Sequence, residues 1–188
     1  MVRTISLIFL VSVTLCLSHP VLGATSDASD TLTKMFRYAN SGDIESLEAM
    51  RKDVNNNRTL VNAYIVALYV ASPDRYAKEF VSQFPVDYSG IMYDIYDQIE
   101  LPQLTPKFLY AFDALGAIAD HGDRLAIKKI ALGLIHSDGV VSEEYCDNLQ
   151  RVFGKYRDEV SNVLKSLSAD EKKQLKRAGC QLNSSGKK

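Results

Sequence analysis

The short sequence HSDGVVSEE concentrates side chains that could ligate a metal ion. His136, Asp138 and Glu144 offer one imidazole and two carboxylates, which are borderline and hard donors suited to a divalent cation. The same residues can be read as a turn between two helices, because Gly139 permits a tight bend and Ser142 can cap the next helix. Three donors fall short of a full ligand set. We therefore favour the turn and keep the metal site as an alternative.

The Asp-Gly-x-x-x-x-Glu pattern that ends at Glu144 resembles the turn of TerB-like tellurite-resistance domains. The sequence AIADHGD, further upstream, repeats this pattern less closely. The resemblance covers residues 117–153 and does not extend over the whole chain. It implies an all-α metal-binding stress protein, with the three donors above as ligands. Tyr145 stands where the family pattern has a further acidic residue.

No familiar catalytic motif appears in the sequence. Two histidines follow the N-terminal segment, His121 and His136, and neither lies in a zinc-protease pattern. A Cys146 nucleophile would need a neighbouring histidine, and a glycosidase would need one defined pair among many carboxylates. We therefore predict no catalytic residue and no enzyme, with an unrecognised periplasmic hydrolase as an alternative. Apart from the metal ion, no cofactor is predicted.

The sequence VDYSGIMYDIYDQIE, residues 86–100, combines tyrosines and acidic residues without a lysine or arginine. On a helix, its isoleucines, Tyr88 and Met92 fall on one inner stripe. The outer face then carries acidic and aromatic side chains: Asp87, Tyr93, Asp94, Tyr96, Asp97 and Glu100. Tyrosine rings beside charges are common at protein interfaces. This pattern predicts a protein-binding surface, and an ordinary solvated helix face is the alternative.

The N-terminal sequence and the cysteines both indicate export. Residues 1–23 have the form of a signal peptide, with Arg3, an apolar run too short to cross a bilayer, and a cleavage position after Gly23. Cys146 and Cys180 then remain, and an even pair in an exported protein predicts a disulfide. A half-buried Cys146 with a free Cys180 is the alternative. We expect a secreted or periplasmic protein with no membrane-spanning segment after the signal peptide.

Charge is nearly balanced in total but uneven along the chain. With Arg3 removed from the 22 basic residues, 21 remain against 23 acidic residues, a balance of −2 that does not favour nucleic-acid binding. Lysine and arginine are absent from Glu79 to Pro106, whereas acidic residues are absent from Lys172 to Lys188. The molecule should therefore be dipolar. We expect a protein partner with a basic surface, and leave the oligomeric state open.

Helical periodicity of apolar residues runs through almost the entire chain. It predicts ten helices, at residues 28–40, 43–53, 58–71, 73–84, 87–99, 106–119, 122–136, 142–153, 156–166 and 169–178. Asp43, Asp74 and Asp123 are expected at helix N-termini, and Ser168 with Glu171 forms a capping box.

These helices are expected to form one all-α domain over residues 24–179, followed by a basic tail over residues 180–188. Its architecture is either a multi-helix bundle or a short irregular HEAT-like array of about nine to ten helices. The predicted core consists of Tyr64, Ile65, Leu68, Phe80, Ile95, Phe108, Phe112, Leu115, Ile130, Leu134, Leu149 and Phe153.

Taken together, these features predict an exported protein-binding module. Its expected form is an inhibitor or immunity protein that neutralises a secreted or cell-wall-acting enzyme. The TerB-like metal-binding protein and the hydrolase are the alternatives. Asn57 and Asn183 begin glycosylation sequons whose use depends on the host.

Overall fold

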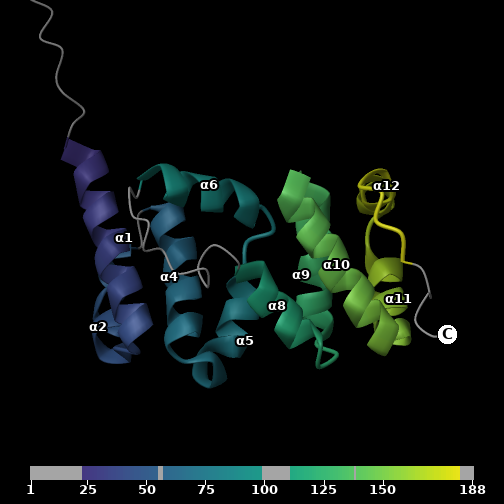
Figure 1. Cartoon of the computed structure of the whole chain (residues 1–188), viewed down its shortest axis with the longest axis horizontal. Helices are drawn as coiled ribbons and strands as arrows, with labels where there is room; N and C mark the ends of the chain where they lie inside the picture. Colours follow the sequence, from purple (N-terminus) through teal and green to yellow (C-terminus); the bar gives the residue numbers. More distant parts are fainter. Residues whose placement is uncertain (1–22, 55–56, 99–110, 138, 183–188) are drawn as a thin grey trace, which may run out of the picture.

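The described part of the chain is all-α and contains eleven helices (Figure 1). This computed structural model describes residues 23–54, 57–98, 111–137 and 139–182, with the side chains of residues 23–27, 91, 94 and 96–98 left out. The helices are α1 (Gly23–Ser41), α2 (Ile44–Ala49), α3 (Arg51–Val54), α4 (Arg58–Ala71), α5 (Pro73–Gln83), α6 (Tyr88–Gln98), α8 (Ala111–Ala119), α9 (Arg124–His136), α10 (Gly139–Lys155), α11 (Arg157–Ser166) and α12 (Ala169–Arg177).

The helices form two groups that follow one another along the long axis of the molecule (Figure 1). In the first group, α4 is central and contacts α1, α2, α3, α5 and α6. In the second group, α9 is central and contacts α8, α10, α11 and α12. Packing between α5 and α9 joins the groups. The arrangement therefore combines the chain-order progression of a helical array with the central helix of a bundle.

The central position of α4 follows from its composition. Its sequence RTLVNAYIVALYVA is apolar on almost every side, and seven of its residues are buried. Asn57 begins the helix, because its side-chain oxygen accepts a hydrogen bond from the amide of Leu60 at 3.1 Å. Pro73 ends it by opening α5, although Ser72 makes no side-chain capping hydrogen bond there. The predicted range of this helix, 58–71, is confirmed.

Aspartates start helices in both groups, as predicted. Asp43 accepts a hydrogen bond from the amide of Ser46 at 3.1 Å, and Asp123 accepts one from Ala126 at 2.8 Å. Asp74 lies in the first turn of α5. These carboxylates satisfy amides that have no partner within the helix and oppose the positive end of the helix dipole.

The second group achieves close packing through glycines. A Cβ atom added to Gly133 of α9 would lie 2.5 Å from the Tyr145 ring of α10. A Cβ added to Gly116 of α8 would lie 2.2 Å from the side-chain oxygen of Asn148. The missing side chains therefore let α8, α9 and α10 approach one another closely.

Ten of the twelve predicted core residues are buried. Phe153 is only partly buried, because it lies at the surface of α10 under the guanidinium of Arg157, 5.4 Å from the ring centroid. Phe108 lies outside the described residues. The core is thus mostly predictable from helical periodicity.

Most predicted helix boundaries with described residues on both sides agree within two residues, and three predictions differ more. The first helix starts at Gly23 instead of residue 28, and the predicted helix 43–53 is divided at Met50 into α2 and α3. At the predicted turn or metal site, α10 begins at Gly139 instead of residue 142. Ser142 therefore lies inside the helix and does not cap it. Gly139, the first residue of α10, has φ 52°, a left-handed conformation that glycine adopts without strain.

Candidate protein-binding surface

One side of α6 is fixed firmly to the core. Tyr88 and Ile95 are buried, and Met92 is partly buried against the same cluster. The Tyr88 ring lies 5.0 Å from that of Phe84, which in turn lies 5.1 Å from that of Phe80. Burial raises the pKa of Tyr88 and keeps its phenol neutral. The inner stripe predicted from the sequence is therefore confirmed for these three residues of α6.

Two hydrogen bonds hold the segment that precedes α6, and the first turn of α6, against the end of α9 and Lys129 within it. The ammonium of Lys129 donates to the carbonyl oxygen of Phe84 at 2.6 Å, and the hydroxyl of Ser137 donates to that of Ser89 at 3.5 Å. Burial lowers the pKa of Lys129. These contacts set the position of α6 relative to the second helical group.

Tyr93 projects from the opposite side of α6 and is 56% exposed. A large aromatic side chain with this exposure contrasts with Tyr88, which is 1% exposed on the same helix. The outward orientation of Tyr93 predicted from helical phasing is confirmed. Asp94, Tyr96 and Asp97 belong to α6, but their side chains lie outside the description, as does the whole of Glu100.

Asp87 is not surrounded only by acidic and aromatic residues, as the sequence suggested, because a cation lies next to it. It immediately precedes α6 and forms an ion pair with Arg58 of α4, while its side chain remains 44% exposed. The segment from residue 79 to 106 has no lysine or arginine of its own, but the fold supplies two cations: Arg58 of α4 pairs with Asp87, and Arg51 of α3 pairs with Glu79. Sequence analysis missed Arg58 because nothing local connects it to this surface.

The predicted metal ligands are only partly described. His136 is exposed at the end of α9, Glu144 is partly buried on α10, and Asp138 lies outside the described residues. Within the described ranges, no group of three or more His, Cys, Asp or Glu side chains is arranged to hold a metal ion. Lys128 and His136 instead lie close enough to Glu171 of α12 to contribute to the lowering of its pKa, after the hydrogen bonds from Ser168.

Tyr145, which departs from the TerB-like pattern, is a core residue. It is fully buried, and its ring lies 5.5 Å from that of Phe112 and against Gly133. Its hydroxyl has no hydrogen-bond partner among the described residues, and burial raises its pKa. Packing across α8, α9 and α10 therefore accounts for an aromatic residue at this position.

The predicted disulfide between Cys146 and Cys180 is confirmed. Their Cα atoms are 5.6 Å apart, and the bond joins α10 to the segment after α12. Cys146 is therefore not a free thiol, which removes the Cys/His nucleophile considered from the sequence.

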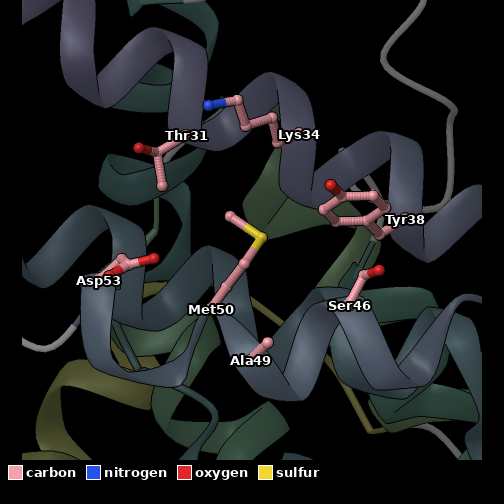
Figure 2. Close-up of a pocket in the computed structure, with 7 residues that line it drawn as sticks. All are labelled: Thr31, Lys34, Tyr38, Ser46, Ala49, Met50 and Asp53. Carbon is pink, nitrogen blue, oxygen red and sulfur yellow. The ribbon is translucent and has the colours of Figure 1, made fainter.

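A shallow groove between α1 and the α2–α3 pair was not predicted (Figure 2). Its volume is about 300 Å³. Two helical stripes line it, with Thr31, Lys34 and Tyr38 on one side and Ser46, Ala49, Met50 and Asp53 on the other. These mixed side chains carry no recognisable catalytic arrangement. The spacing is i, i+3 and i+7 on α1 and i, i+3, i+4 and i+7 along α2 and α3, and it indicates the groove only once these helices are known to be neighbours.

The described helices include none that is both long enough and apolar enough to cross a membrane. Comparison of the chain with family models, curated proteins and solved structures finds no match. The resemblance to TerB-like domains therefore stays a prediction.

Proposed function

We propose that the protein is an exported binding module that uses α6 to capture a basic surface on a protein partner. The observation that carries this proposal is Tyr93, whose ring is 56% exposed on a helix whose other side is locked into the core. An aromatic residue held in this way can bury a large area at an interface with little loss of side-chain entropy.

Rigidity of the helix supports the proposal. The edge-to-face contact of Phe80 with Phe84 and the tilted contact of Phe84 with Tyr88 fix the inner side of α6, and the bonds from Lys129 and Ser137 fix its beginning. A surface that is already ordered before binding loses less conformational entropy when a partner docks.

Charge indicates the kind of partner. The segment from residue 79 to 106 has five acidic residues and no lysine or arginine, although Arg51 offsets part of this charge at Glu79 and Arg58 offsets part of it at Asp87. Negative charge beside an exposed tyrosine suits a cationic partner and would speed its association. We therefore propose an inhibitor or immunity protein that occupies the cationic cleft of a secreted or cell-wall-acting enzyme.

Affinity capture from the extracellular or periplasmic fraction of the native host tests this function. The mature protein should retain a basic protein, and the variant Tyr93→Ala with Asp97→Lys should lose it while keeping its thermal unfolding temperature. Leu125→Ala is the matched control, because Leu125 is an exposed apolar residue, 44% exposed, on α9. Equal capture by the wild type and the α6 variant would contradict the proposal.

A further inference from the structure

The last helix, α12, is positioned firmly although it buries very little. None of its nine residues is buried, and its main apolar contact is the partly buried Leu175. A capping box begins it, in which Ser168 accepts from the amide of Glu171 and the Glu171 carboxylate accepts from the amide of Ser168 at 2.6 Å. The helix packs across α9 at one end of the molecule (Figure 1).

A covalent bond holds the other end of α12. Gly179 turns the chain with φ 74°, and Cys180 is then bonded to Cys146 of α10. The side-chain amide of Gln150 on α10 also donates to the carbonyl oxygen of Gln181 at 3.0 Å. Burial of apolar surface does not explain this attachment, so we ask what the exposed face of α12 presents.

That face is strongly cationic. Lys172, Lys173, Lys176 and Arg177 are exposed and lie within an arc of about 140° at 100° per residue. The Lys172 ammonium donates to the carbonyl oxygen of Lys165 in the last turn of α11. The other three form no ion pair among the described residues, whereas several cations of the first helical group are paired. Acidic residues are absent from the sequence after Glu171.

We propose that the exposed face of α12 binds a sulfated polysaccharide. Lysine and arginine pairs one helical turn apart, as at positions 172/176 and 173/177, present rows of positive charge to a regularly charged polymer. The disulfide holds these charges in one arrangement, which lowers the entropy lost on binding. A disulfide is also typical of proteins exposed to an oxidising extracellular environment, where such polymers occur.

Other polyanions fit this face less well. The strongly exposed large apolar residues among those described are Tyr93, Leu125 and Val140, and none belongs to α12. The face therefore lacks the apolar side chains that insert into a lipid surface and the aromatic rings on which nucleic-acid bases stack. Its recognition chemistry is multiple point charges facing sulfate groups.

Salt elution from immobilised heparin tests the proposal. The variant Lys173→Ala, Lys176→Ala, Arg177→Ala should bind about tenfold or more weakly at low salt and show a shallower dependence of affinity on salt. Its control is Lys52→Ala, Lys78→Ala, Arg124→Ala, which removes the same charges from exposed positions outside α12. Equal weakening of both variants would overturn the proposal, as would unchanged binding by the α12 variant.

Two further arms test the ligand class and the role of the disulfide. Duplex DNA and phosphatidylserine vesicles should bind more weakly than heparin at the same salt concentration, and equal or tighter binding to either would overturn the assignment to a polysaccharide. Cys146→Ala with Cys180→Ala keeps every charge and should weaken heparin binding several-fold. If that variant is folded and binds heparin as tightly as the wild type, the disulfide does not organise this face.

Discussion

The two helical groups solve the same packing problem in different ways. Each surrounds a largely buried central helix, α4 or α9, that begins with a side-chain cap from Asn57 or Asp123. Both groups also use ring contacts and polar side chains, but the second adds close helix approach at Gly116 and Gly133 and a disulfide. The contrast shows that similar helix patterns do not determine how the outer helices are fixed.

In the first group, a polar network joins α2 to α5. The guanidinium of Arg75 and the hydroxyl of Tyr76 both donate to the carboxylate of Glu48, at 2.8 and 2.6 Å. Burial and this hydrogen bond raise the pKa of Tyr76 to about 12, so the phenol stays a donor at neutral pH. Next to this network, the rings of Tyr69 and Phe80 stack at a centroid distance of 4.4 Å.

In the second group, the disulfide between Cys146 and Cys180 attaches the end of α12 to α10. Removing it with Cys146→Ala and Cys180→Ala should lower the free energy of unfolding by about 4 kcal/mol, because the bond closes a loop of 34 residues. Hydrogen exchange should show faster exchange in α12 and little change in α4. Equally faster hydrogen exchange in α4 and α12 would show that the disulfide stabilises both groups alike, which would contradict this prediction.

Close approach at a glycine should be the next largest effect. Gly133→Ala should destabilise the protein by about 1–3 kcal/mol, since the new Cβ would overlap the buried Tyr145 ring. Gly154→Ala is the control on α10, because a Cβ there meets nothing within 4 Å and alanine favours a helix interior. Denaturant unfolding should therefore show a lower free energy of unfolding for Gly133→Ala and a slightly higher one for Gly154→Ala. Similar losses in both variants would contradict this account of the packing.

The smallest expected effect compares the helix caps of the two groups. The hydrogen bonds from Ser46 lower the pKa of Asp43 below its ordinary value of 3.8, and those from Ser168 lower the pKa of Glu171 below 4.5. A lowered pKa in the folded state means that each cap stabilises above the ordinary pKa and is lost as pH falls through the folded pKa.

Asp43→Asn and Glu171→Gln should each reduce the loss of stability between about pH 5 and 2, because a neutral amide does not protonate there. Thermal unfolding across this pH range measures the change, with Asp74→Asn as the comparison, an acid in the first turn of α5. An unchanged pH profile in either cap variant would contradict the role of its ionised cap.

The phasing of the described α6 side chains could be predicted from sequence because its determinants are local. Helical phasing places Tyr88 and Ile95 inside and Tyr93 outside, as observed. The same reasoning could not find Arg58 beside Asp87, since this contact depends on how α4 lies relative to the start of α6. Nor could it assign Tyr145 to the core, because its partners Phe112 and Gly133 come from two other helices.

The sequence by itself determined the all-α class, most helix boundaries and caps, and the pairing of the only two cysteines that follow the signal-like segment. These features follow from periodicity and from hydrogen bonds between residues three or four positions apart. The tertiary structure alone decided which helices are central, where Arg58 and Tyr145 lie, and that α12 packs against α9. Those properties depend on contacts between distant segments, whose geometry no local pattern specifies.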